Sequence, residues 1–456
     1  MKVYKLFALL LTFATAWGSH LSAKVIDVKS PNGELNLSVD VKDKIYYSVS
    51  YGNDLLLKDC YLNLQLENET LGNNPKLRST KKGVIDESVK REIPLKNAVV
   101  KNHCNTLRMN FAGNYAVEFR VFDNGVAYRF ITDKKGENIV MGEDFVLNFP
   151  ANYKAHLSQP NGFKTSYEYP YTHVNTEEYK ATDRMSYLPI LLETDKPYKI
   201  LISEADLHDY PCMFLKSTGR NGMQSLFPKV PLEFGEDGDR SLKILKEADY
   251  IAKTAGKRSF PWRFMVITKE DKQLLENEMV YNLSTPCVLE DYSWIKPGQV
   301  SWEWWHDAML PGSDLPSGMN NRNTALYKHY IDFAAENQLE YLMLDAGWSD
   351  LFDLTKVNPQ IDIQELVSYG KSKNVGAFLW CVAHTLISDI DKYMKTLSDW
   401  GIAGLLHDLD EEQCDWQHDM SVHGPTSVEI LKKEGIDDPV LGDAIKAHNP
   451  KCGMKA

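Results

Sequence analysis

The chain has 456 residues, of which 43% are hydrophobic and 25% are charged. That balance is typical of a globular protein with a sizeable core, and it excludes a disordered chain or a fibrous repeat. Acidic residues outnumber basic ones by 63 to 51, which gives a formal net charge of −12. Because no run of Lys or Arg concentrates positive charge, we expect no nucleic-acid partner.

Residues 1–23 have the features of a secretory signal peptide. Lys2 and Lys5 precede an apolar run, Leu6–Trp17, and Leu21-Ser22-Ala23 resembles a cleavage site. The apolar run has only about 12 residues, whereas a membrane-spanning helix needs about 20. We therefore expect an exported, periplasmic protein rather than one held by an N-terminal membrane anchor, and we expect no membrane span elsewhere.

Residues 24–272 alternate apolar and polar side chains with a period of two, which is typical of half-buried antiparallel strands. The clearest pair is a hairpin whose strands, Val117–Val121 and Val126–Phe130, flank the turn Asp123-Asn124-Gly125. Asn-Gly readily adopts the positive φ values of a tight turn. The pattern predicts a large N-terminal β-sandwich domain.

From residue 299 onward, short apolar strands alternate with amphipathic helices, which indicates successive βα units and a parallel sheet. We predict a linker over residues 273–298 and four units over residues 299–408. About 30 residues per unit is the repeat of a (β/α)8 barrel. The predicted strands are Val300–Trp305, Leu339–Leu344, Val375–Val382 and Ile402–Leu406, and the predicted helices are Thr324–Asn337, Ile361–Lys373 and Ser388–Trp400.

The last predicted helix has Ser388 as its N-cap and Gly401 as the left-handed residue that ends it. Residues 409–456 contain no further strand–helix pair, so they are predicted to be a divergent tail. The predicted fold class is thus an antiparallel β domain followed by a (β/α)8 barrel that is incomplete, with about four βα units.

In parallel βα folds, functional side chains cluster at the C-terminal ends of the strands, because the βα loops form one face there. Acidic groups bind hydroxyls and act in acid–base or nucleophilic steps, and Trp rings offer apolar platforms. Their combination favours a carbohydrate site over a phosphate or nucleotide site. The candidates are Trp304 and Trp305 after the first strand, Asp345 and Trp348 after the second, Trp380 and His384 on and after the third, and Asp408 after the fourth.

Four of the tryptophans have a structural alternative, in the barrel core or in packing between two domains: Trp302, Trp304, Trp305 and Trp380. The carboxylates are harder to explain in this way. A lone carboxylate at the end of a buried strand costs desolvation free energy unless something is bound to it. We therefore favour a functional role for Asp345 and Asp408.

Three segments together resemble glycoside hydrolase family 97: Phe119–Phe130, Ser293–Trp305 with its Trp302-Glu303-Trp304-Trp305 motif, and Asp345–Trp348. The resemblance runs from about Lys24 to Asp408 and leaves the tail unmatched. It implies an exported enzyme with an N-terminal β-super-sandwich, a (β/α)8 barrel and a C-terminal β domain. It also implies hydrolysis of α-glucosides or α-galactosides in oligosaccharides, with calcium as a cofactor.

Retaining α-galactosidases of this family carry an Asp nucleophile at the end of the fourth strand, in a pattern like Gly-Leu-Lys-Val-Asp. Here the stretch is Gly404–Asp408, and Leu406 and His407 depart from the pattern. The resemblance implies that Asp408 is the nucleophile of a retaining α-galactosidase and that Glu168 is a calcium ligand. The family's acid/base Glu and its other calcium ligands have no match in this sequence.

Two alternatives stay open. One is an inverting α-glucosidase of the same family, in which Asp408 would be dispensable. The other is a non-catalytic carbohydrate-binding remnant, because half of the barrel has no counterpart before the tail; a frameshift soon after codon 408 would give the same pattern. The acidic stretch His407–Glu412 offers ligands for a divalent metal, but we favour a solvated charge run there.

Overall fold

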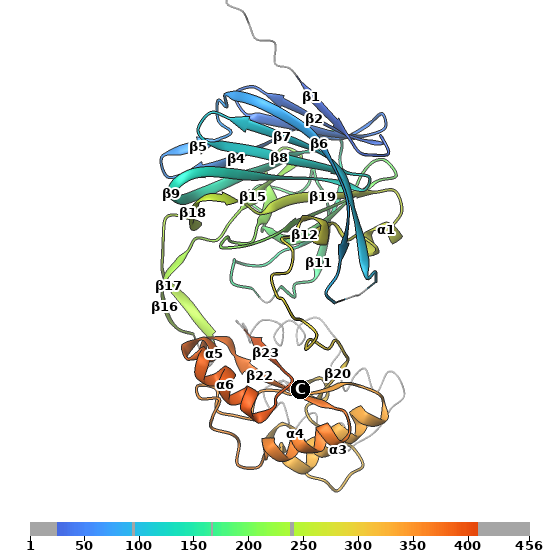
Figure 1. The fold of residues 1–456 in the computed structure, drawn as a ribbon, viewed down its shortest axis with the longest axis vertical. Coiled ribbons are helices and arrows are strands. Elements are labelled where there is room, and N and C mark those ends of the chain that lie inside the picture. Colours follow the sequence, from blue (N-terminus) through green and yellow to red (C-terminus); the bar gives the residue numbers. More distant parts are fainter. Residues whose placement is uncertain (1–24, 94–95, 166, 238–240, 409–456) are drawn as a thin grey trace, which may run out of the picture.

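The computed structural model describes residues 25–93, 96–165, 167–237 and 241–408. They form two parts that follow one another along the chain, a large β part and a smaller part with parallel strands and helices (Figure 1). The predicted signal peptide and the predicted tail 409–456 lie outside the described residues.

Antiparallel pairing organises the β part. Strands β1 to β15 join β18 and β19 in a single 17-stranded sheet, and β16 pairs with β17 in a separate hairpin. The strands are β1 (Ile26–Lys29), β2 (Leu35–Val41), β3 (Ile45–Tyr51), β4 (Asp54–Leu66), β5 (Glu69–Leu71), β6 (Leu77–Lys90), β7 (Val99–Phe111), β8 (Tyr115–Phe122), β9 (Gly125–Asn148), β10 (Lys154–Ser158), β11 (Tyr171–Asn175), β12 (Ser186–Glu193), β13 (Lys199–Ala205), β14 (Phe214–Ser217), β15 (Gly222–Leu226), β16 (Pro231–Asp237), β17 (Ser241–Glu247), β18 (Ala252–Ser259) and β19 (Trp262–Thr268).

Alternating burial along these strands turns one face of the sheet towards a common core. In β2 the side chains of Leu35, Leu37 and Val39 are buried, whereas the residues between them are partly exposed. The same alternation in other strands adds to one hydrophobic cluster that extends in sequence from Val28 to Ile267. The predicted period-two strands and the predicted antiparallel β domain are confirmed.

The predicted hairpin forms, but its glycine has a different role from the one predicted. Phe122 at the end of β8 pairs with Gly125 at the start of β9, and Gly125 is not among the residues with positive φ. A Cβ atom on Gly125 would overlap the carbonyl oxygen of Met265 in β19 and the side chain of Met279. Gly125 is therefore required by the close approach of neighbouring chain segments rather than by the turn.

Two short helices, α1 (Lys272–Leu275) and α2 (Met279–Leu283), follow β19 in the region predicted as a linker. Met279 and Leu283 are buried in a second cluster together with Trp262 of β19. Because α2 packs against the sheet, the β domain continues through this helix. The connecting segment without helix or strand is residues 284–299.

The second part is a parallel sheet with helices between its strands. No helix among the described residues is long and apolar enough to cross a membrane. The strands β20 (Val300–Trp302), β21 (Tyr341–Leu344), β22 (Gly376–Val382) and β23 (Gly404–Asp408) pair in chain order, each parallel to the next. The 3-10 turns η1 (Glu303–His306) and η2 (Met319–Asn321) and helix α3 (Thr324–Glu336) follow β20, α4 (Ile363–Ser372) follows β21, and α5 (Ala383–Ser388) and α6 (Ile390–Trp400) follow β22.

The predicted alternation of strands and helices is confirmed, but several boundaries differ, among them those of the fourth strand, which is Gly404–Asp408 rather than Ile402–Leu406. The first strand ends at Trp302 rather than at Trp305, because the chain turns into η1. The last predicted helix is two helices: Ser388 ends α5, and Asp389 instead caps α6 by accepting a backbone N–H of its first turn. Gly401 follows α6 with a φ of 80°, as predicted.

The parallel sheet separates two hydrophobic clusters. Leu342, Leu344 and Leu379 pack with residues of the helices on one face. Met343 and Trp380, which alternate with them, pack in a smaller cluster on the other face. These strands are thus buried on both faces, as parallel strands usually are.

Gly125→Ala is expected to destabilise the β part, because the added methyl group would overlap Met265 and Met279. We expect the free energy of unfolding to fall by about 1–3 kcal/mol, the usual cost of overpacking. Gly162→Ala is the control, because a Cβ atom there meets no atom within 4 Å. Chemical denaturation measures both variants, and equal stabilities would contradict the packing role of Gly125.

Candidate active site

The C-terminal ends of β20 to β23 lie at one edge of the parallel sheet. Trp302, the last residue of β20, pairs with Met343 of β21, and Asp408, the last residue of β23, pairs with Val382 of β22. Parallel pairing therefore brings the strand ends that carry Asp345 and Asp408 to the same edge. Both residues were predicted to lie at this edge for the same reason.

Asp345 follows β21 directly and is 6% exposed. Its Oδ2 accepts the indole N–H of Trp302 at 2.5 Å, and its Oδ1 accepts the backbone N–H of Ala346 at 2.6 Å. Hydrogen bonds to an ionised group are strong and offset part of the desolvation cost of a buried carboxylate. The protein itself thus holds Asp345 in one orientation at the edge where we expect a sugar.

Glu303 is a buried carboxyl group beside Asp345 that the sequence analysis did not select. It is 1% exposed, and its Oε1 accepts the backbone N–H of Asp345 at 3.1 Å and the hydroxyl of Tyr327 at 2.9 Å. The Nε atom of Arg322 lies 3.6 Å from the same oxygen. Burial raises the pKa of Glu303 above its ordinary value of 4.5, and these three groups oppose that shift only in part. Its position inside the Trp302–Trp305 motif was the signal that could have identified it.

Three tryptophans cluster at the end of β20. Trp302 and Trp304 stack with ring centroids 5.7 Å apart and an interplanar angle of 28°, and Trp305 meets both rings edge-on. Trp304 is half-buried, whereas Trp305 is 73% exposed. A large exposed ring near carboxylates is suited to the apolar face of a sugar. The predicted substrate-binding role of Trp305 is therefore compatible with its exposure.

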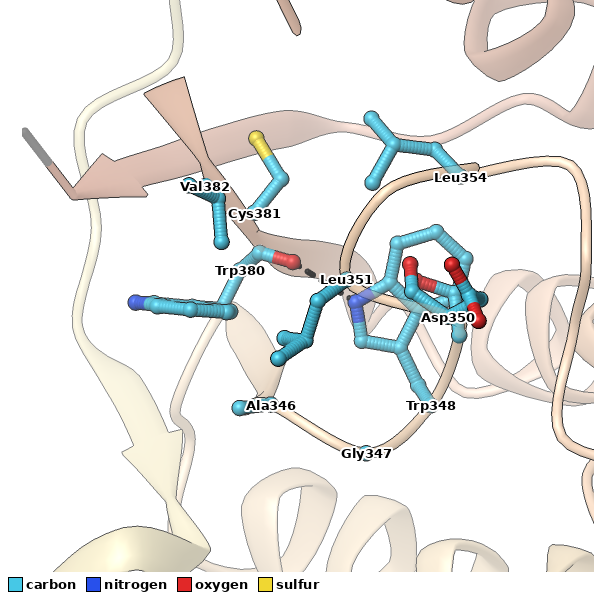
Figure 2. A pocket seen from close by; sticks show the side chains of 10 residues that line it. Ala346, Gly347, Trp348, Asp350, Leu351, Leu354, Trp380, Cys381 and Val382 are labelled. Atoms are coloured by element: carbon cyan, nitrogen blue, oxygen red, sulfur yellow. Dashed lines mark hydrogen bonds between the residues drawn. The ribbon is translucent and has the colours of Figure 1, made fainter. Parts of the chain in front are cut away.

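Trp348, in the loop after β21, and Trp380, within β22, lie in the interior (Figure 2). Trp348 is 1% exposed and donates its indole N–H to the backbone carbonyl of Trp380 at 2.7 Å. Trp380 is 5% exposed and packs with Met343 and Val382. The burial of both rings supports the predicted alternative of core packing for Trp380, and it supports the same role for Trp348.

His384 is half-buried in the first turn of α5, and it lines a cavity of about 760 Å³. Most of the other walls come from the β part, with Phe163, Tyr210 and Tyr250 among them. A cavity of this size with aromatic walls accommodates a small ligand. His384 therefore borders open space, as we expect of a substrate-binding residue.

Glu168 is exposed on the connection between β10 and β11. The preceding Tyr167 has a φ of 61°, which is uncommon for an aromatic residue. Its ring packs edge-on against Tyr187, and its hydroxyl lies 3.4 Å from Cys212 Sγ, so these contacts anchor the loop beside Glu168. Within the described ranges no group of three or more His, Cys, Asp or Glu side chains is placed to hold a metal ion, at Glu168 or elsewhere.

An antiparallel β domain followed by parallel βα units, with carboxylates and tryptophans at the strand ends, is compatible with a glycoside hydrolase. The chain belongs to glycoside hydrolase family 97. The model described as "Glycosyl-hydrolase 97 N-terminal" matches residues 28–286, and the model "Glycoside hydrolase 97" matches residues 304–426. The second match continues past Asp408, where the motifs alone placed the end of the resemblance.

Two curated relatives are described as retaining α-galactosidases. The one from Bacteroides thetaiotaomicron is 34% identical over 401 residues, which cover 85% of this chain and 60% of the relative. A probable retaining α-galactosidase from Streptomyces bingchenggensis is 28% identical over 386 residues, which cover 80% of this chain and 54% of the relative. The chain thus spans little more than half of the length of these relatives.

Solved structures of the family share the fold. A glycoside hydrolase family 97 enzyme from Pseudoalteromonas sp. strain K8, in complex with acarbose, matches with a TM-score of 0.72 at 19% identity, over 84% of this chain and 58% of that one. A β-arabinopyranosidase matches with a TM-score of 0.69 at 23% identity, over 84% of this chain and 62% of that one. At these identities the likeness shows the arrangement of the β domain and the parallel βα units.

Trp348→Ala and Trp305→Ala are expected to have opposite consequences. Removing the buried Trp348 ring leaves a cavity, and we expect the free energy of unfolding to fall by about 3–5 kcal/mol. Removing the exposed Trp305 ring should change it by less than about 0.5 kcal/mol and weaken sugar binding instead. Denaturant unfolding and galactose titrations measure the two effects. A loss of stability of the same size in both variants would contradict this distinction.

Glu303 should make the stability of the protein depend on pH. Because its pKa is raised in the folded state, the stability it contributes is complete below about pH 4.5 and is lost as the pH rises through the folded pKa. Glu303→Gln has no carboxyl group to ionise, so the variant should gain stability relative to the wild type over that range. Denaturation at a series of pH values measures this, with the exposed Glu336→Gln as control. Parallel curves for wild type and Glu303→Gln would contradict the raised pKa.

Proposed function

We propose that this chain acts in an exported glycoside hydrolase that removes terminal α-galactosyl residues from oligosaccharides with retention of configuration. The observation that carries the proposal is the position of Asp408, which is the last residue of β23 at the same sheet edge as Asp345. The 34% identity to a protein described as a retaining α-galactosidase supports it. Export to the periplasm is part of the proposal and rests on residues 1–23.

The proposal includes a complete (β/α)8 barrel, of which the described strands form one part. Strands β20 to β23 pair in chain order, with a helical connection after each of the first three, which is the arrangement of consecutive units in a (β/α)8 barrel. We propose that these strands are the first half of such a barrel and that the β part is its super-sandwich. Active sites of (β/α)8 barrels lie at the C-terminal face of the strands.

In the proposed reaction Asp408 is the nucleophile. Its carboxylate oxygen forms a bond to the anomeric carbon while the glycosidic C–O bond breaks, and the leaving oxygen takes a proton from a carboxylic acid. Water then attacks the anomeric carbon of the galactosyl ester, gives a proton to that same acid/base group and releases Asp408. Two inversions at one carbon retain the configuration.

Other residues at the edge bind the sugar in this proposal. Asp345 accepts hydrogen bonds from sugar hydroxyls, because its carboxylate is already oriented by Trp302. Trp305 packs its exposed ring against the apolar face of the sugar, with Trp304 in edge-on contact. His384 contacts the substrate from the cavity that it lines. The acid/base group has no assignment among the described residues.

Calcium and its ligand Glu168 are also proposals, and they rest on the family resemblance. Ca²⁺ takes about six to eight oxygen ligands. In the part of the chain that the structure describes, no group of three or more His, Cys, Asp or Glu side chains could hold a metal ion at Glu168 or elsewhere. These residues do not by themselves fit a calcium ion, and no step above passes through one.

Hydrolysis of α-galactosides and α-glucosides, with NMR detection of the first sugar anomer released, tests the proposed function. We expect α-galactosides to be cleaved with α-galactose as the first product, and we expect Asp408→Asn to lower kcat about a thousandfold or more. Asp399→Asn is the matched control, because this Asp is exposed on α6 and its carboxylate forms an ion pair with Lys395 at 2.8 Å.

Each of the other outcomes identifies an alternative. Release of β-galactose first would contradict retention. A preference for α-glucosides, with full activity in Asp408→Asn, would favour the inverting α-glucosidase. Sugar binding without turnover in the wild type would favour the non-catalytic carbohydrate-binding protein.

A further inference from the structure

Trp302 and Glu303 are consecutive residues that hold Asp345 from two sides. Trp302, at the end of β20, donates its indole N–H to the Asp345 carboxylate. Glu303, at the start of η1, accepts the backbone N–H of Asp345 at 3.1 Å. Trp302 packs with Met343 on one face of the sheet, whereas Glu303 contacts Tyr327 of α3 on the other. Trp302 thus fixes the side chain of Asp345, and Glu303 fixes its backbone.

The backbone of Asp345 needs this support. The last residue of β21 that pairs with β22 is Leu344, so the hydrogen-bond ladder does not reach Asp345. Its N–H points to Glu303 instead. Without an acceptor there, a buried N–H would be unsatisfied and the segment after β21 would be free to rotate.

Glu303 is itself held by neighbouring elements. Tyr327, which is 0% exposed, donates its hydroxyl to Oε1 at 2.9 Å, and Arg322 Nε lies 3.6 Å away. Arg322 also packs against Gly347, where a Cβ atom would overlap its guanidinium group. The carboxyl group of Glu303 therefore connects α3 and the segment before it to the loop Asp345–Trp348.

The stability of the fold does not explain a carboxyl group at this position. Among the described residues Glu303 Oε2 and Arg322 Nε have no hydrogen-bond partner. Apolar side chains of similar volume often replace such a buried pair with no loss of stability. A neutral acceptor would also satisfy the Asp345 N–H. What this position requires is an acceptor oxygen for the backbone N–H of Asp345, which Glu303 Oε1 supplies.

We propose that Glu303 is a positioning residue that orients Asp345 for the hydroxyl groups of the bound galactoside. This inference rests on the proposed function, since it takes Asp345 as a substrate-binding residue. With its backbone held by Glu303 and one oxygen held by Trp302, Asp345 offers the substrate a carboxylate that is already ordered. Substrate binding then loses less side-chain and loop entropy.

The indole N–H of Trp302 reports the orientation of Asp345 without requiring activity. We expect its proton resonance, assigned by its loss in Trp302→Phe, to lie downfield because of the short hydrogen bond to the carboxylate. In Glu303→Ala we expect it to move upfield, towards the resonance of the exposed Trp305. The indole of Trp348, which is bonded to the backbone of Trp380, is the internal reference and should not move. An unmoved Trp302 resonance in folded Glu303→Ala overturns the proposal.

Two more variants complete this experiment. If Glu303→Ala does not fold, Tyr327→Phe decides in its place, because it removes one donor to Glu303 and keeps the ring. Movement of the Trp302 resonance in the same direction supports the proposal, and an unmoved resonance overturns it. Glu340→Ala is the matched control, because Glu340 accepts the backbone N–H of Gln299 at 2.7 Å just before the start of β20.

Kinetics on an α-galactoside separate positioning from a loss of stability. We expect Glu303→Ala to raise KM about tenfold, and we expect Glu303→Gln, which keeps an acceptor oxygen, to recover most of that loss. In the double variant, adding Glu303→Ala to Asp345→Asn should raise KM no further, because the two residues act as a unit. Additive losses overturn the proposal. If the wild type cleaves no α-galactoside, the proposed function fails, while the Trp302 resonance still decides whether Glu303 orients Asp345.

Discussion

The parallel pairing of β20 to β23 is the constraint on which the site depends. Parallel strands end at a common edge, so residues as distant in sequence as Asp345 and Asp408 lie at the same edge of the sheet. Backbone hydrogen bonds fix the edge only as far as the last paired residue. Asp345 lies one position beyond the last paired residue of β21. Its position is therefore fixed by hydrogen bonds to the side chains of Trp302 and Glu303 instead of by backbone hydrogen bonds between strands.

Much of the fold could be predicted from the sequence, because burial imposes a local period. The period of two identified the β part, and the helical period placed α3 and α4 within two residues of where they begin. The errors lie where a contact distant in sequence decides the outcome. Gly125 follows a turn-like motif, but a glycine is required there because β19 and α2 approach its backbone closely. Similarly, β20 stops at Trp302 where the carboxyl group that follows is buried against Tyr327.

The candidate site could be predicted only in part from the sequence, again because contacts distant in sequence decide the role of some residues. Strand ends could be located, so Asp345, Asp408 and the exposed Trp305 were identified as candidates by position. Alternation gives no information once a strand has ended, and Trp348 therefore could not be recognised as a buried residue. Glu303 lies between tryptophans in the sequence and was not selected as a candidate. Its hydrogen-bond partners are distant in sequence: Tyr327 in α3 and the backbone of Asp345 after β21.

The segment β20–η1 should tolerate substitution more readily than a change in length. Adjacent residues there serve opposite faces of the sheet, so inserting or deleting one residue would exchange them. An indole would then meet Arg322 and Tyr327, and a carboxyl group would enter the apolar cluster of Met343. Among natural variants we expect insertions to fall instead in the loop of residues 307–318, which is bounded by two 3-10 turns and lies beyond the ladder. We therefore expect the number of residues in β20–η1 to be more restricted than the identity of any single side chain there.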